Sequence, residues 1–310
     1  MKKYFYILIG FIGIIGLILF ISQFSVFART LTSLGLIDLP QVSSCSGSGS
    51  MNILVIGSDY AELKGEKGSD LTRIVRVDFD NKKAAIFSFS RDLLVDTTGL
   101  GLVNPVVNSS RLGMVFYEGR IRSPQLLASD TIVDGTRISA KMLSKNFSIN
   151  SDHFVSIDLN NLGTLIDSIG GLPINIPIRT TDPFIGTVIE AGQQTLTGPM
   201  LVAYARAIPD SDFGRIKRND LIISALRAKL IDPSVLLKLP VLLKDSKSII
   251  ATDLAEADIN NLICIMKEIP ADSIVYDGVK PEWTTMNSDG SLSWDKQLVT
   301  ERLSALGLIK

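Results

Sequence analysis

Residues 51–59 read MNILVIGSD, an apolar run that ends in Gly57, Ser58 and Asp59. Such a run, bounded by a Gly-Ser pair, is typical of a buried strand whose carboxyl end leads into a loop. Residues 71–79 and 84–89 are two more strand-like runs, and Asp80-Asn81 between them favours a tight turn. These runs predict three consecutive strands of one sheet.

The segments that follow alternate between helix and strand patterns. Helices are expected at residues 159–169, 197–207, 212–226, 253–269 and 295–306. The first of them is expected to end at Gly170-Gly171, and a short strand follows at residues 172–177. The alternation predicts one α/β domain that starts near Asn52, with a less distinctive stretch after Pro240 forming a small terminal part.

The composition excludes several classes of protein. The 310 residues carry 31 Lys and Arg against 32 Asp and Glu, and a net charge near zero argues against broad nucleic-acid binding. Two cysteines are too few for a disulfide scaffold, and no Cys/His cluster is present to hold zinc. The single histidine, His153, lies near no Ser or Cys nucleophile motif, so we expect a structural role for it.

The first 28 residues predict a membrane anchor. Residues 4–28 carry no charge, and about 20 apolar residues suffice to span a bilayer. Lys2 and Lys3 favour a cytoplasmic N-terminus. We therefore expect a cytoplasmic stub at residues 1–3, a transmembrane helix at 4–28 and an extracytoplasmic remainder. A cleaved signal peptide is the alternative, since residues 26–28 read VFA, which resembles a cleavage site.

A stalk is expected between the anchor and the domain, at residues 29–51. Residues 43–50 read SSCSGSGS, the composition of a flexible linker. Cys45 lies inside this linker and far from Cys264 in the sequence, so it is interpreted as an unpaired, exposed thiol.

Two polar clusters follow the predicted strands. Asp59 and Asp70 each follow a Gly-Ser pair, and two carboxylates on such loops suit Mg²⁺. Taken alone, each Asp is more typical of an ordinary turn. Arg91 follows a strand in SFSRD, residues 88–92, and its planar guanidinium suits phosphate oxygens. The alternative is a surface ion pair between Arg91 and Asp92.

A third cluster begins at Arg206 and continues through DFGRIKR at residues 212–218. Asp212 is expected to cap a helix on which Arg215 and Arg218 lie three residues apart and share one face. A helix amino-terminus favours anions, because its first N–H groups and the helix dipole point toward them. The alternative is a solvated basic face.

In this order, the motifs resemble the LytR-CpsA-Psr (LCP) family of cell-envelope proteins. The resemblance covers residues 52–228, and DFGRIKR is its most specific part. It rests also on GSD at 57–59 and 68–70, SFSRD at 88–92, SDHF at 151–154 and IGG at 169–171. It implies a domain at residues 52–240 with a central mixed sheet flanked by helices on both faces, and a C-terminal extension at 241–310 packed on it.

The activity implied by the resemblance is that of a membrane-anchored extracytoplasmic phosphotransferase. Such proteins move a glycopolymer from a polyprenyl-pyrophosphate carrier to peptidoglycan, and they hold the lipid in a long apolar pocket. Membrane lipid is then a further partner, and nucleic acid is not expected. Phosphoryl transfer depends mostly on positioning and charge neutralisation, so it needs no Ser/His nucleophile.

The resemblance also implies a role for each motif residue. Asp59 and Asp70 would hold Mg²⁺. Asp212 would orient arginine side chains or act as the base for the attacking hydroxyl. The residues implied to bind pyrophosphate are Arg91, Arg206, Arg215 and Arg218, with Arg91, Asp212 and Arg215 forming the catalytic set.

The chain departs from the family pattern at several positions. Arg is usual where Gly68 and Ile208 stand, Lys where Val106 stands and Pro where Ser90 stands. Lys67 is expected to replace part of the missing charge, and arginine at positions 68 and 208 would be expected to strengthen pyrophosphate binding.

These departures keep other functions open. One is a catalytically weakened lipid-binding or regulatory protein of the cell envelope. Another is hydrolysis of the pyrophosphate by water. Direct DNA binding, which the family's older label as a transcriptional attenuator would imply, is not expected, because the short cytoplasmic stub contains no basic recognition helix. The glycopolymer and the acceptor hydroxyl do not follow from the sequence.

Overall fold

A six-stranded sheet forms the centre of the computed structural model, which describes residues 45–59, 68–102, 108–122, 131–182, 186–207, 211–230, 235 and 250–309. Its strand order is β11-β6-β1-β2-β3-β12. Neighbouring strands pair antiparallel except β1 with β6 and β3 with β12, so the sheet is mixed. The strands are β1 (Ser50–Ser58), β2 (Leu71–Asp78), β3 (Lys83–Phe89), β6 (His153–Asp158), β11 (Ile250–Thr252) and β12 (Ile274–Gly278).

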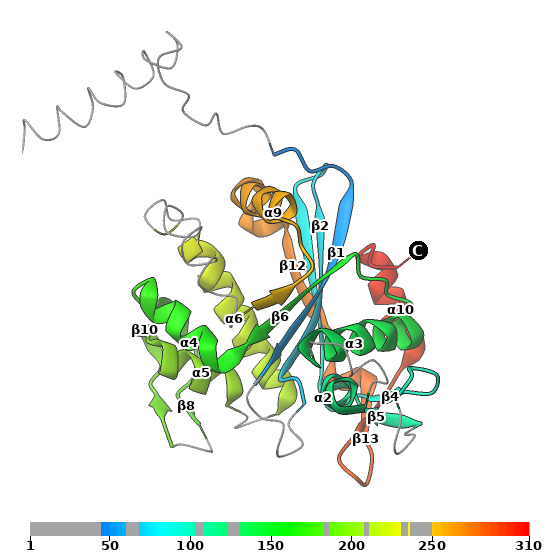
Figure 1. Cartoon of the computed structure of the whole chain (residues 1–310). Coiled ribbons are helices and arrows are strands. Elements are labelled where there is room, and N and C mark those ends of the chain that lie inside the picture. The colour runs from blue at the N-terminus through cyan, green and yellow to red at the C-terminus, as the bar shows by residue number, and fades with distance from the viewer. Residues whose placement is uncertain are drawn as a thin grey trace, which may run out of the picture. The chain divides into compact units, whose positions relative to one another are not determined.

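Helices lie on both faces of this sheet (Figure 1). One group is α2 (Leu112–Arg122), α3 (Thr131–Phe147) and α10 (Lys296–Ala305). The other is α4 (Leu159–Ser168), α5 (Gly198–Arg206), α6 (Asp212–Leu230) and α9 (Glu256–Glu268). Within the described part of the chain, short 3₁₀ helices span Ala271–Ser273 and Pro281–Trp283. The prediction of the α/β class, with a central mixed sheet between helices, is confirmed.

Apolar residues on both faces of β2 explain why helices cover both faces of the sheet. Ile74 is fully buried and packs in a core with Phe87 of β3 and Val115 of α2. Val77, on the opposite face, packs with Ile265 of α9. Because alternate strand residues point to opposite faces, a strand that is apolar on both sides predicts cover on both sides.

Among the described residues, four two-stranded sheets accompany the central one. They are β4 (Leu94–Asp96) with β5 (Ser109–Arg111), β7 (Leu172–Ile176) with β10 (Gly192–Leu196), β8 (Thr180–Thr181) with β9 (Val188–Ile189), and β13 (Thr284–Met286) with β14 (Leu292–Trp294). The strand expected at residues 172–177 is therefore present but lies outside the central sheet. It packs with α5 and α6 in a second core that includes Leu172, Leu201 and Ile222.

The helix ends agree with their sequence signals except at α6. Gly170 and Gly171 adopt φ of +82° and +80° after α4, which a residue with a Cβ adopts at a cost. Asp212 was expected to cap α6, but the helix begins at Asp212 itself, and Ser211 Oγ accepts the hydrogen bond from Gly214 N at 3.2 Å. The Asp212 carboxylate therefore does not cap α6 and is available to other partners.

The N-terminal predictions fall mostly outside the described residues. Residues Gly47–Lys310 form one unit and Met1–Ser46 another. The expected anchor at 4–28 and most of the stalk are not among the described residues. Within the described part, no helix has the length and apolarity needed to cross a membrane.

Candidate functional site

The residues that the sequence singled out lie together at one end of the central strands. Because β2 runs antiparallel to β1 and β3, β1 and β3 end where β2 begins. Asp59 follows β1, Asp70 precedes β2 and Arg91 follows β3. Asp70 N donates to Gly57 O at 2.8 Å, which fixes the start of β2 against the end of β1.

Asp70 is the centre of the cluster. Its Oδ1 accepts hydrogen bonds from Arg91 Nη1 and Arg215 Nη1, both at 2.9 Å. Its Oδ2 lies 3.6 Å from Arg206 Nε. Arg206 comes from the end of α5 and Arg215 from the first turns of α6, so three separate elements bring guanidinium groups to one carboxylate.

Arg206 also links the two carboxylates that were predicted to hold a metal. Its Nη2 lies 3.7 Å from Asp59 Oδ2, while its Nε faces Asp70 Oδ2. Asp59 and Asp70 therefore converge on one cationic group. Two converging carboxylates fit Mg²⁺, which proteins usually hold through one or two such groups and substrate phosphates.

Asp212 holds two of the arginines in place. Its Oδ2 accepts the backbone N–H of Arg91 at 2.9 Å, and its Oδ1 accepts Arg215 Nη2. Both carboxylate oxygens are thus engaged in a buried position. Of the two roles that the resemblance left open, these contacts favour the orienting one.

The arginines retain donor groups that the described chain does not use. The Nε atoms of Arg206 and Arg215 are buried and make no hydrogen bond within the described residues. Arg215 is almost wholly buried, with a side chain 2% exposed. The side chains of Arg91 and Arg206 are 40% and 25% exposed, so their guanidinium groups can reach an anion bound at this site.

Arg218 lies in a different setting from Arg215. Its Nη2 donates to Ala207 O at the end of α5, and its charge lies near Tyr204. Burial raises the pKa of Tyr204, and the charge of Arg218 opposes that rise. Arg218 therefore connects α6 to α5, and its predicted contact with pyrophosphate stays a prediction. Lys67, Val106 and Ile208 lie outside the described residues.

Sequence reasoning missed the buried pair Arg73 and Asp220. Arg73 Nη1 donates to Asp220 Oδ1, and Arg73 Nη2 donates to Ile216 O at 3.2 Å. Burial lowers the pKa of Arg73 and raises that of Asp220, although each charge opposes the shift of the other. The pair links α6 to β2, at a position of β2 three residues after Asp70. The signal was an Arg at an inward position of a strand otherwise apolar on that face.

Sequence reasoning also missed Arg111, which ends β5 and immediately precedes α2 in the chain. Together with Arg91 and Asp92 it lines a pocket of about 290 Å³. Arg111 Nη1 lies 3.6 Å and Arg91 Nε 3.9 Å from Asp92 Oδ1. Burial raises the pKa of Asp92, and the negative charge of Asp212 adds to this rise. No motif marked Arg111, because tertiary structure alone brings it beside Arg91.

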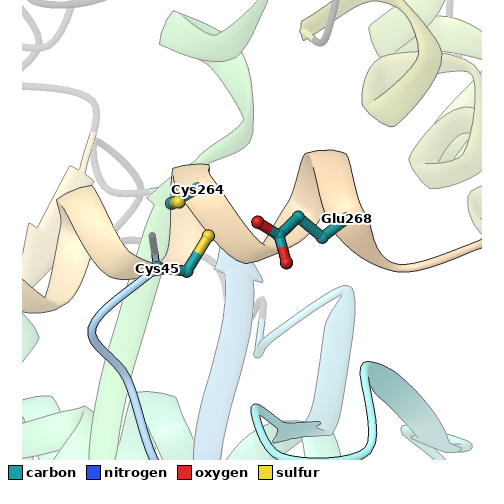
Figure 2. Close-up of side chains that lie close together, drawn as sticks. All are labelled: Cys45, Cys264 and Glu268. Carbon is teal, nitrogen blue, oxygen red and sulfur yellow. The ribbon is translucent and has the colours of Figure 1, made fainter. Parts of the chain in front are cut away.

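The remaining sequence candidates lie apart from this site. His153 starts β6 and pairs with Ile53, at the opposite end of the strands from Asp59, and its Nδ1 is 3.4 Å from Asp253 Oδ1. Figure 2 labels the side chains of Cys45, Cys264 and Glu268. Both cysteines are disulfide-bonded and neither is free, so the interpretation of Cys45 as an unpaired thiol is wrong. A disulfide also leaves no thiolate as a metal ligand.

Fold and site together define an α/β protein in which carboxylates hold a cluster of arginine side chains at one end of the central strands. The LytR_cpsA_psr family model matches residues 32–303, and the chain belongs to this family. The regulatory protein MsrR of Staphylococcus aureus is 29% identical over 196 residues, which are 62% of this chain and 53% of MsrR. The chain thus spans about half the length of this curated relative.

Three further comparisons agree with this membership. The polyisoprenyl-teichoic acid–peptidoglycan teichoic acid transferase TagU of Enterococcus faecalis is 23% identical over 58% of this chain and 54% of TagU. The crystal structure of B. subtilis TagV superposes with a TM-score of 0.67 at 18% identity, over 85% of this chain and 99% of TagV. The structure of TagT bound to LIIa-WTA gives a TM-score of 0.61 at 17% identity, over 83% of this chain and 89% of TagT. At these identities the structures establish the fold.

Proposed function

We propose that this chain is a phosphotransferase that moves a glycopolymer from a polyprenyl-pyrophosphate carrier to a hydroxyl of peptidoglycan. The observation that carries the proposal is the convergence of Arg91, Arg206 and Arg215 on Asp70, with the side chains of Arg91 and Arg206 partly exposed. Family membership and the printed activity of the relative TagU support the same reaction class.

The proposed reaction exchanges one P–O bond for another. The acceptor hydroxyl attacks the phosphorus that carries the sugar, a new P–O bond forms, and the bond to the lipid phosphate breaks. The lipid monophosphate leaves, and the hydroxyl proton passes to a base or to water. Arg91, Arg206 and Arg215 would bind the pyrophosphate oxygens and neutralise the charge on the leaving phosphate.

Asp59, Asp70 and Asp212 organise these arginines. Asp212 holds the Arg91 backbone and the Arg215 side chain, so both guanidinium groups are positioned before the substrate binds. Asp59 and Asp70 would hold Mg²⁺, which would supply a further positive charge at the phosphate oxygens.

The cellular location is part of the proposal. The uncharged run at residues 4–28 after Lys2 and Lys3 favours a single-pass anchor with the domain outside the cell. A domain in that place meets a lipid-borne donor and a wall acceptor together. Protease added to intact spheroplasts should digest the domain, and protection beside a digested surface control would disprove this topology.

A second candidate is a regulatory or lipid-binding protein with weak transfer. It is favoured by Gly68, because a Cβ placed there would lie 2.1 Å from Gly113 O and leave no room for the family's arginine. MsrR is also named as a regulatory protein. A short-chain polyprenyl-pyrophosphate disaccharide that binds but is never transferred would favour this candidate.

The test uses the full chain in detergent with that donor and a peptidoglycan acceptor. Arg91→Gln and Arg215→Gln should each lower turnover, and their double-mutant cycle should be non-additive because both bind one ligand. Lys217→Gln, an exposed change on the same helix, is the matched control and should leave turnover unchanged. Strictly additive small losses, or equal turnover with chelator and with Mg²⁺, would contradict the proposal.

A further inference from the structure

The proposed reaction needs a base for the hydroxyl proton, and three carboxylates of the site are engaged by other groups. Asp70 accepts from two arginines through Oδ1 and faces a third through Oδ2. Asp212 accepts with both of its oxygens. Asp59 is 8% exposed and faces Arg206 Nη2 at 3.7 Å. A general base needs an oxygen that the reacting hydroxyl can reach, so these three carboxylates are poorly placed for that role.

Asp92 lies in a more open setting. It follows β3 and lines the pocket of about 290 Å³ beside the arginine cluster. Arg111 Nη1 lies 3.6 Å and Arg91 Nε 3.9 Å from its Oδ1, and both distances exceed that of a hydrogen bond. The side chain of Asp92 is 27% exposed. Its carboxylate can therefore accept a hydrogen bond from a hydroxyl group in the pocket.

Arg91 connects this pocket to the place where the pyrophosphate is proposed to bind. Its Nη1 donates to Asp70, and its Nε faces Asp92. Two edges of one guanidinium group thus face two carboxylates. A hydroxyl group bound at Asp92 would lie beside a phosphate bound at Arg91, which is the arrangement that attack on phosphorus requires.

Arg111 is held beside Asp92 by the C-terminal hairpin. Its Nη2 donates to Asp289 O in the turn between β13 and β14. That turn is itself ordered, because Asp289 Oδ1 accepts from Ser291 N at 2.9 Å. The hairpin therefore fixes the distance between a positive charge and the Asp92 carboxylate.

The charges around Asp92 act in both directions. Burial raises the pKa of Asp92, and the negative charge of Asp212 adds to this rise. The positive charges that oppose the rise are those of Arg91, Arg111 and Arg215. A raised pKa makes the carboxylate a better proton acceptor, while the arginines favour the ionised form that a base requires.

We propose that Asp92 is the general base for the acceptor hydroxyl and that Arg111 is a positioning residue for its carboxylate. Asp92 takes the proton while the hydroxyl oxygen forms its bond to phosphorus. The bond from phosphorus to the bridging oxygen breaks, and its electron pair leaves with the lipid phosphate. The proton then passes from Asp92 to water. The inference rests on the proposed function and deepens it, because it assigns the proton acceptor of that reaction.

The experiment measures transfer by the full chain in detergent as a function of pH, with a short-chain polyprenyl-pyrophosphate disaccharide and peptidoglycan. Wild-type turnover should rise with pH as Asp92 loses its proton and then level off. Asp92→Asn should lower kcat about 100- to 10,000-fold, the usual contribution of a general base, and should lose this rise. Asp92→Glu keeps a carboxylate and should retain part of the turnover. Asp272→Asn, an exposed change on a 3₁₀ helix, is the control and should keep the wild-type profile.

Two further measurements separate a base from a residue that only supports the fold. Calorimetry with inorganic pyrophosphate should show that Asp92→Asn binds at least as tightly as wild type, because a negative charge is removed from beside the cluster. Arg111→Gln should move the rise in turnover to higher pH, since its positive charge favours the ionised form of Asp92.

Wild-type turnover by Asp92→Asn would overturn the inference. So would a loss of pyrophosphate binding as large as its loss of turnover, or an Arg111→Gln profile that does not move. Failure of the wild-type chain to transfer the disaccharide would instead count against the proposed function.

Discussion

Gly68 stands where the family usually has arginine, and its surroundings show that the difference is more than the loss of one positive charge. Its backbone packs on the carbonyl of Gly113, and the neighbouring Ser69 N donates to that same oxygen at 2.7 Å. Gly113 N in turn donates to Arg91 O at 2.9 Å. The two glycines therefore let the loop before β2, the start of α2 and the loop after β3 approach closely enough to place Arg91. An arginine at position 68 would disturb that approach.

Gly68→Ala is expected to lower the free energy of unfolding by about 1–3 kcal/mol, the usual cost of overpacking. Gly68→Arg should cost at least as much and should not tighten pyrophosphate binding, in contrast to the expectation from the family pattern. Urea denaturation and calorimetry with inorganic pyrophosphate measure the two effects. A Gly68→Arg protein of wild-type stability that binds pyrophosphate more tightly would contradict this account.

At the scale of elements, α6 positions most of the site. Asp212 and Arg215 lie in its first turns, and Arg73 of β2 holds its middle through Asp220 and Ile216 O. Removing one partner of a buried ion pair leaves an uncompensated charge, whereas replacing both with apolar residues removes the desolvation cost.

Arg73→Met is therefore expected to destabilise the protein by about 3 kcal/mol, and Arg73→Met with Asp220→Leu should recover most of that loss. Chemical denaturation of the single and double variants measures the difference. The exposed pair of Lys82 and Glu268, at 2.8 Å, is the control, and Lys82→Met should cost less than about 1 kcal/mol. If the double variant were as unstable as Arg73→Met alone, an apolar pair could not replace the ion pair, which would contradict this prediction.

A contact between β4 and α3 predicts that the stability of the fold depends on pH. Asp96 ends β4 and accepts Thr98 N at 2.8 Å, Thr98 Oγ1 at 2.6 Å and Lys145 Nζ, on α3, at 3.0 Å. The hydroxyl and N–H of Thr98, with Lys145, lower the pKa of Asp96 from 3.8 to about 2. A lowered pKa in the folded state contributes stability above pH 3.8 that is lost as the pH falls through about 2.

Asp96→Asn should therefore lower the Tm at pH 7, and the difference from wild type should shrink between pH 4 and pH 2. Thermal unfolding followed by circular dichroism at both pH values measures it. Asp272, an exposed carboxylate on a 3₁₀ helix, is the control, and Asp272→Asn should show no such trend. A constant difference across this pH range would mean that the carboxylate charge does not act here.

At the scale of the whole molecule, the C-terminal residues complete the fold. β11 and β12 form the two edges of the central sheet, and α10 buries Val299 and Leu303 in the core beside β3 and α2. The β13–β14 turn also supports Arg111. The last 60 residues therefore contribute to the sheet, the core and the pocket.

Leu303→Ala is expected to cost about 2–5 kcal/mol, because it empties a fully buried position. Leu298→Ala, on the same helix but 38% exposed, is the matched control and should cost less than about 1 kcal/mol. Denaturation followed by far-UV circular dichroism compares them. Equal small losses would mean that α10 is an appendage rather than part of the core.

The sequence by itself determined the elements that have a strong local signal. The strands around residues 53, 74 and 87 follow from apolar runs, and the end of α4 follows from two adjacent glycines. The α/β class and the family follow from the order of short motifs. These features depend on neighbours along the chain, so they can be read without the fold.

Only the tertiary structure decided which side chains meet. Arg111 reaches Arg91 and Asp92 because a hairpin almost 180 residues later holds it, Arg73 meets Asp220 147 residues away, and Gly68 meets Gly113 through loops that no pattern pairs. Likewise β12 pairs with β3 as an edge strand although the sequence after Pro240 was indistinct. Contacts of this kind depend on packing between distant segments, and a local pattern contains no information about its distant partner.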